Sequence, residues 1–194
     1  MAFKPAENQF VLRKRINFKD AAFVVVPIPY EKTTSYGQGT KYGPSAVIDA
    51  SYQIELWDEE TKEETWKKGI FTTQPVNCAL TENRFFPSLE RTVEKLLSST
   101  KALPFFVGGE HSVTQGLLPP FIKRHKDLSI LHFDAHADLR LTFEGSKHSH
   151  ACAVYPASRT NKIVQIGIRS VGVDERQFHN AGNVKTYLMH KNLD

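Results

Sequence analysis

The sequence predicts an α/β protein with a three-layer α/β/α arrangement and a mainly parallel sheet covered on both faces. Two observations support this class: several short apolar runs have the length of strands, and segments with helical periodicity lie between them. A chain of 194 residues is long enough to bury one sizeable core. We therefore expect a single domain over residues 1–194.

Four apolar runs are predicted to be buried strands. Each is 5 to 8 residues long, and three of them are rich in β-branched residues or phenylalanine. In chain order they cover residues 21–28, 103–107, 128–134 and 162–168. Runs this short favour strands over helices, which need more residues to form a stable element.

Helical patterns separate these strands. In residues 87–99 the apolar side chains recur at helical spacing, with polar side chains between them. Residues 114–125 form a second predicted helix, which two adjacent prolines interrupt. An irregular, glycine-containing loop begins at Thr33, and Pro44 is predicted to open a helix over residues 45–50.

Composition argues against several classes of function. The chain holds 25 Lys and Arg against 21 Asp and Glu, and no basic run exceeds residues 13–15, which indicates a solvated surface rather than a nucleic-acid interface. Two isolated cysteines, Cys78 and Cys152, form neither a disulfide framework nor a CxxC metal site, so we expect a reducing, cytoplasmic setting. The sequence shows no signal-peptide pattern and no apolar run near the ~20 residues that span a bilayer, so no membrane partner is expected.

The densest motif follows the third predicted strand. Asp134, His136 and Asp138 alternate after the apolar run LSILHF, and in extended backbone such residues point to one side. The carboxyl end of a strand is also where open α/β sheets bind ligands. Like-facing carboxylates lose solvation without a partner, and a divalent cation such as Mn, Fe, Zn or Ni removes that conflict. We therefore predict a metal site.

A second motif follows the second predicted strand. Gly108-Gly109-Glu110-His111-Ser112 allows a tight turn, and it places His111 at a strand end like that of the first motif. We expect both motifs to face one crevice, with His111 as a fourth ligand.

Together these motifs resemble the ureohydrolases, the family of arginases, agmatinases, guanidinobutyrases and formiminoglutamases. GGEHS at residues 108–112 and DAHAD at 134–138 match its two leading signatures. The loop at 29–44 and the strand and turn at 165–170 are also similar to family segments, so the resemblance covers nearly all of the chain from about Ala22 onward. It implies an arginase/deacetylase-like fold and hydrolysis of a guanidino compound.

The resemblance implies a dinuclear manganese site. Its ligands are His111, Asp134, His136 and Asp138, with Asp134 as the bridging ligand. Two such ions share a hydroxide that attacks the guanidinium carbon. The late Ser-x-Asp-x-Asp motif, which supplies two further ligands in the family, does not occur here. We therefore expect a fragment, a truncated gene product or an incomplete chain, and we expect the 194 residues alone to bind one metal weakly and to be inactive.

Further residues are assigned by the same resemblance. His150 matches the family histidine that carries a proton or contacts substrate, and His148 ranks second as a substrate contact. The loop after DAHAD has no asparagine to hold an amino-acid head, and Glu144 is placed to attract the ammonium group of agmatine. Arg140 and Lys147 in that loop are equally able to hold an acid. We expect agmatine as the best substrate, guanidinobutyrate second and arginine last.

Alternative interpretations remain at this point. One is a non-catalytic, truncated relative that keeps the fold. Another is a deacetylase-like zinc amidohydrolase, which is disfavoured because two signatures match the ureohydrolases and Asp138 offers a ligand for a second metal. The resemblance also implies polyamine biosynthesis as the setting and a homo-oligomer, a trimer or hexamer, as the assembly.

Overall fold

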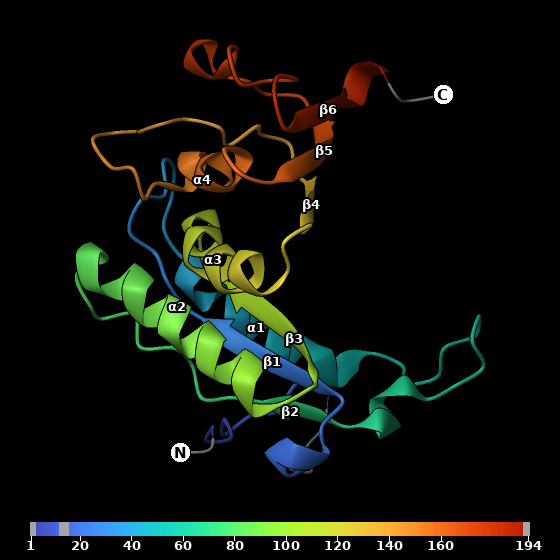
Figure 1. The fold of residues 1–194 in the computed structure, drawn as a ribbon. Coiled ribbons are helices and arrows are strands. Elements are labelled where there is room, and N and C mark those ends of the chain that lie inside the picture. The colour runs from blue at the N-terminus through green and yellow to red at the C-terminus, as the bar shows by residue number, and fades with distance from the viewer. Residues whose placement is uncertain (1–2, 12–15, 192–194) are drawn as a thin grey trace. The chain divides into compact units, whose positions relative to one another are not determined.

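The computed structural model describes residues 3–11 and 16–191 (Figure 1). The chain divides into two compact units, which are described separately. The first unit comprises Met1–Lys32, Tyr36–Thr81 and Arg91–Glu110, and the second comprises Thr33–Ser35, Glu82–Glu90 and His111–Asp194. The basic run at 13–15 lies outside the described residues. The prediction of a single domain stays a prediction.

The first unit contains a parallel sheet in the order β2-β1-β3. Strand β1 (Phe23–Ile28) pairs with β2 (Ile70–Thr72) on one side and with β3 (Leu103–Gly108) on the other. Helix α1 (Gly43–Ala50) begins with Pro44 in its first turn, as predicted, and contacts β1 and β3. The central strand β1 is buried along almost all of its length.

The second unit contains another parallel sheet, in the order β4-β5-β6, which runs from yellow to red in Figure 1. Its strands are β4 (Ser129–Phe133), β5 (Lys162–Ile168) and β6 (Val184–Leu188). Helices α3 (Thr114–Arg124) and α4 (Tyr155–Ser158) contact each other. The core of this unit gathers around fully buried aliphatic side chains of β5 and of the segment after β4, among them Leu139, Ile163 and Ile168.

Helix α2 (Glu82–Ser99) begins five residues before the predicted start. The sequence prediction began at Pro87, the first residue of the segment whose apolar side chains recur at helical spacing. Here Pro87 lies inside the helix, and the buried rings of Phe85 and Phe86 extend the helix toward its N-terminus. The described residues also contain short 3-10 helices, at Phe18–Asp20, Thr40–Tyr42, Ser51–Gln53, Thr65–Lys68, His111–Val113, His150–Cys152, Val173–Glu175 and Met189–Lys191.

The α/β class with parallel strands and flanking helices is confirmed, but two strands are less buried than predicted. On β3, Leu103 and Phe105 are 57% and 48% exposed, and on β4, Leu131 and Phe133 are 58% and 69% exposed. Each of these strands is an edge strand of its sheet among the described residues, with one face uncovered. An apolar run shows that a strand is suited to burial, but it does not show that both faces are covered.

No helix in the described part of the chain is long and apolar enough to cross a bilayer.

Candidate metal centre

The metal motif begins where β4 ends. Ile130 and His132 point toward the core of the second unit, and the alternation of the strand puts Asp134 next on the same side. The backbone N–H of Asp134 still donates to the carbonyl of Ile166 on β5 at 3.2 Å. Beyond this point the chain leaves the strand, and Asp138 adopts a left-handed backbone with φ of 50°. The predicted extended alternation therefore does not reach Asp138.

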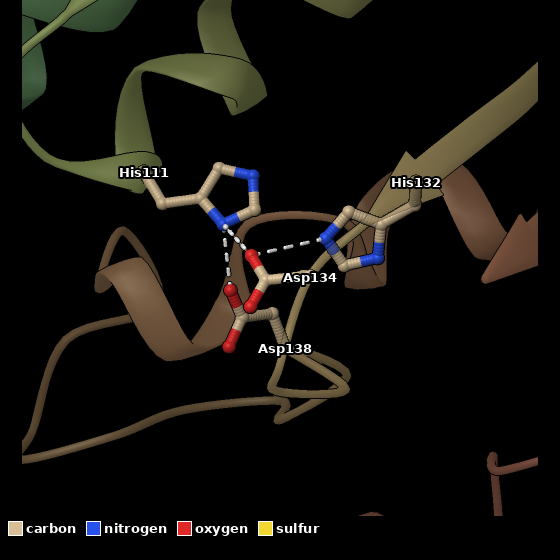
Figure 2. A group of neighbouring side chains, drawn as sticks. All are labelled: His111, His132, Asp134 and Asp138. Atoms are coloured by element: carbon tan, nitrogen blue, oxygen red, sulfur yellow. Dashed lines mark hydrogen bonds and ion pairs between the residues drawn. The ribbon is translucent and has the colours of Figure 1, made fainter. Parts of the chain in front are cut away.

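Three of the four predicted metal ligands meet in one cluster, shown in Figure 2. His111 begins a 3-10 helix, and its Nδ1 lies 2.7 Å from Asp138 Oδ2 and 3.4 Å from Asp134 Oδ2. Together with His132, the ligand atoms of these residues lie within 4.8 Å of one another. The Asp138 side chain is only 9% exposed, so water alone solvates it poorly. Paired carboxylates and imidazoles in this arrangement suit a divalent transition metal.

The fourth predicted ligand, His136, lies outside this cluster. Its side chain is 65% exposed, and its Nδ1 is 3.4 Å from Asp134 Oδ1, the oxygen that also accepts a hydrogen bond from the His136 backbone N–H at 2.8 Å. The two oxygens of Asp134 therefore face different partners: Oδ2 faces His111, and Oδ1 faces His136. The role of His136 as a ligand stays a prediction.

The electrostatics of the cluster favour the ionised form of Asp134. Burial opposes ionisation of Asp134, but the backbone hydrogen bond from His136 and the neighbouring imidazoles outweigh it, so the Asp134 pKa is lowered. Burial would likewise lower the pKa of His111, yet the hydrogen bond and charge of Asp138, together with the charge of Asp134, raise it. The anionic cluster thus attracts positive charge, either a proton on His111 or a metal cation.

The sequence prediction missed His132. This ring is 6% exposed, and Figure 2 shows it approaching Asp134 from β4, with Nε2 at 3.5 Å from Oδ2. Burial and the charge of His111 lower the His132 pKa, against the opposing charges of Asp134 and Asp138. The sequence analysis includes His132 only as part of the apolar run predicted to be a strand. Its spacing of two residues from Asp134 was the available signal.

His150 lies among hydroxyl groups. Its backbone N–H donates to Thr33 Oγ1 at 3.0 Å, and its ring nitrogens lie near three hydroxyls: Nδ1 is 3.4 Å from those of Thr33 and Ser149, and Nε2 is 3.3 Å from that of Ser35. Phe143 packs edge-on against the ring, with centroids 5.8 Å apart. Its predicted catalytic role stays a prediction.

His148 is fixed by stacking and hydrogen bonding. Its ring stacks on Phe86 with centroids 4.2 Å apart, and its Nδ1 lies 2.9 Å from Gln115 Oε1. Burial and the nearby Lys147 lower its pKa, against the opposing charge of Glu82. Because a carbonyl oxygen only accepts, Nδ1 is the protonated nitrogen of this neutral ring. The predicted substrate contact at His148 is not tested by these interactions.

The loop after the metal motif holds Arg140 and Glu144. The Arg140 guanidinium lies 3.6 Å from Asp174 and 3.8 Å from Glu175, and it packs over the ring of Phe143 at 4.6 Å. Glu144 is exposed, with a left-handed φ of 49°. The charge of Arg140 is therefore already balanced by protein carboxylates, whereas Glu144 faces solvent.

A parallel α/β fold with carboxylates and imidazoles gathered at a strand end defines an α/β protein with a candidate metal centre. Sequence comparison identifies the family within that class. Residues 21–193 match the arginase family, so the chain belongs to the arginase family.

Individual relatives agree with this assignment. The chain is 32% identical to an N(1)-aminopropylagmatine ureohydrolase of a Synechocystis species, over 99% of this chain and 65% of the relative. It is 28% identical to an agmatinase of Pyrococcus horikoshii, over 88% of this chain and 59% of the relative. The crystal structure of agmatine ureohydrolase of Thermoplasma volcanium superimposes with a TM-score of 0.82 at 26% identity, over 100% of this chain and 64% of that one. The chain thus spans less than two thirds of these relatives.

Proposed function

We propose that the protein is a two-metal ureohydrolase that hydrolyses agmatine to putrescine and urea. The observation that carries this proposal is the cluster of His111, Asp134 and Asp138 in a chain of the arginase family. Its donor set suits a divalent cation, and the names of the relatives support a guanidino substrate.

We assign two manganese ions to the centre. His111, Asp138 and Asp134 would hold one ion, and His136 and Asp134 would hold the other. The partners that already face each oxygen of Asp134 support this division. When bound, two such ions supply a hydroxide nucleophile at neutral pH.

His150 acts as the proton carrier to the leaving amine in this proposal. The hydroxyls of Thr33, Ser35 and Ser149 lie near its ring nitrogens and orient it. Substrate contacts come from Glu144 and His148.

The charges of the loop favour a substrate with a cationic tail. Arg140 and Lys147 are equal candidates for holding a carboxylate in the sequence, but the Arg140 guanidinium is already paired with Asp174 and Glu175. Glu144 is exposed and attracts an ammonium group instead. A polar head left without partners costs about 1–3 kcal/mol per missing hydrogen bond. We therefore rank agmatine first, guanidinobutyrate second and arginine last.

A second candidate substrate is N(1)-aminopropylagmatine. The observation that favours it is the Synechocystis relative of that name, at 32% identity. It presents the same guanidino group to the metals, so the two candidates differ only in the tail. Polyamine biosynthesis in the cytoplasm suits either substrate, and we propose a homo-oligomer, a trimer or hexamer, with neither nucleic acid nor membrane as a partner.

The test is urea release by the full-length, manganese-loaded protein. We expect kcat/KM to be highest for agmatine or N(1)-aminopropylagmatine, lower for guanidinobutyrate and lowest for arginine. The Asp134→Asn variant is the matched control and should release no urea. A protein that prefers arginine contradicts the substrate proposal, and one that hydrolyses no guanidino compound with manganese bound contradicts the activity.

A further inference from the structure

Behind the metal cluster, a chain of buried polar side chains crosses the second sheet. Thr186 of β6, Gln165 of β5 and His132 of β4 lie on neighbouring strands and are 8%, 0% and 6% exposed. Thr186 Oγ1 donates to Gln165 Oε1 at 3.0 Å, and Gln165 Nε2 lies 3.0 Å from His132 Nδ1. Buried polar groups are costly unless paired, so this row has a specific role.

The orientation of Gln165 follows from its neighbours. The same Nε2 lies 2.6 Å from the backbone carbonyl of Ala137, and a carbonyl oxygen only accepts hydrogen bonds. The atom that faces Ala137 is therefore the amide nitrogen, and its second hydrogen points at His132 Nδ1. Turning the amide over would place two carbonyl oxygens against each other.

This orientation fixes the tautomer of His132. Because Nδ1 accepts the hydrogen bond from Gln165, the ring proton is on Nε2. Nε2 is buried and has no hydrogen-bond partner, and Asp134 Oδ2 lies 3.5 Å away from it. That distance exceeds an ordinary N–H···O bond by a few tenths of an ångström. A nitrogen that carries a proton cannot ligate a metal through the same atom.

We propose that His132 is a positioning residue and not a metal ligand. Thr186 and Gln165 hold its Nε2–H toward Asp134 Oδ2, and this donor fixes the orientation of the carboxylate that bridges the metals. The inference rests on the metal centre of the proposed function. Hydrogen bonds to ligating carboxylates commonly change metal affinity by about 10–100-fold.

The first test observes the proton itself. Long-range 1H–15N spectra of the 194-residue chain, with His132→Gln used to assign the ring signals, are recorded with and without Zn²⁺. We expect the proton on Nε2 in the metal-free chain and the same N–H, shifted by a stronger hydrogen bond, with Zn²⁺ bound. A proton on Nδ1, or loss of the Nε2 proton on Zn²⁺ binding, overturns the inference while leaving the metal centre intact. If Zn²⁺ shifts no signal of His111, the metal centre fails, and the inference fails with it.

The second test measures Mn²⁺ affinity by the electron paramagnetic resonance of the free ion. We expect His132→Phe to weaken binding about 10–100-fold and Gln165→Leu to weaken it severalfold. Gln9→Leu is the matched control, because Gln9 is 2% exposed and donates to the carbonyls of Ala6 and Thr72 in the first unit. Equal Mn²⁺ affinity in the Gln165 and Gln9 variants overturns the inference, and the spectra above decide the tautomer even if a variant folds poorly.

Discussion

Buried or half-buried carboxylates follow strands in both units, yet their partners differ. In the first unit, Glu31 accepts hydrogen bonds from the backbone N–H groups of Gly39 and Lys41, and Glu110 accepts one from the N–H of Lys32. In the second unit, Asp134 and Asp138 face the imidazoles of His111 and His132. The first pair stabilises loops through amides, whereas the second pair faces two imidazoles, of which we assign His111 as a metal ligand and His132 as a positioning residue.

The difference between the two kinds of carboxylate depends on the groups that face their oxygens, and not on the unit to which they belong. Glu175 belongs to the second unit and is 4% exposed, but its two oxygens accept from the backbone N–H groups of Leu139 and Gly172 at 2.7 and 2.6 Å. A buried carboxylate whose oxygens are used by amide donors holds a loop in place. A carboxylate that faces imidazoles from other elements is able to take a metal.

The largest expected effect separates these two kinds of carboxylate. Asp134→Asn should weaken Mn²⁺ binding by more than about 100-fold, because it removes the charge of the proposed bridging ligand at nearly constant volume. Glu110→Gln and Glu175→Gln, which remove more deeply buried charges, should leave the affinity within about threefold, since backbone N–H groups of Lys32, Leu139 and Gly172 donate to these carboxylates. Isothermal titration of the three variants measures this. A comparable loss of Mn²⁺ affinity in all three variants would contradict the distinction between metal-binding and loop-holding carboxylates.

The next prediction concerns the carboxylates that hold loops, and here stability should change rather than metal affinity. Glu110→Ala should lower the free energy of unfolding by about 1–3 kcal/mol, because the backbone N–H of Lys32 loses its buried acceptor. Urea denaturation followed by circular dichroism measures this, with exposed Glu60→Ala as the control. A stable Glu110→Ala variant that loses its metal would show that Glu110 belongs to the metal centre.

The sequence indicated the strands and the metal motif but not the partners of each side chain. Apolar runs and the spacing of Asp134, His136 and Asp138 were sufficient for the α/β class and for a site at the end of β4. The exposed position of His136 outside the cluster and the left-handed backbone of Asp138 are both features that no periodicity encodes. The place of His132 depends on Gln165, 33 residues away. Contacts between residues far apart in the sequence cannot be predicted from local sequence patterns.

The two edge strands offer a smaller test. Replacing Leu131 and Phe133 on β4 by threonine should change the free energy of unfolding by no more than about 0.5 kcal/mol per residue, because both side chains are largely exposed. The same change at Leu103 and Phe105 on β3 should behave alike and should also reduce binding of an apolar dye. Thermal melts and dye fluorescence measure both. A loss above about 2 kcal/mol at one strand only would show that its apolar face is covered.

The smallest effect concerns the thiols, one in each unit. Burial raises the pKa of both Cys78 and Cys152 from 9.0 to about 11. The resulting contribution to stability is fully present below pH 9.0 and is lost as the pH rises toward about 11, because the unfolded chain releases these protons first. Alkylation by iodoacetamide should be slow at pH 8, and slowest at Cys152, which is 1% exposed. Rapid labelling of Cys152 at that pH would contradict its burial.

The left-handed backbone at Asp138 limits what can replace it. A residue with φ of 50° is readily glycine, asparagine or aspartate, and a residue that binds a cation through a carboxylate is aspartate or glutamate. Only aspartate meets both conditions. A saturation library at this position, sorted for folding, should return glycine, asparagine and aspartate. Sorted for Mn²⁺ retention, it should return aspartate alone, so one codon is constrained twice, once by the backbone and once by the charge.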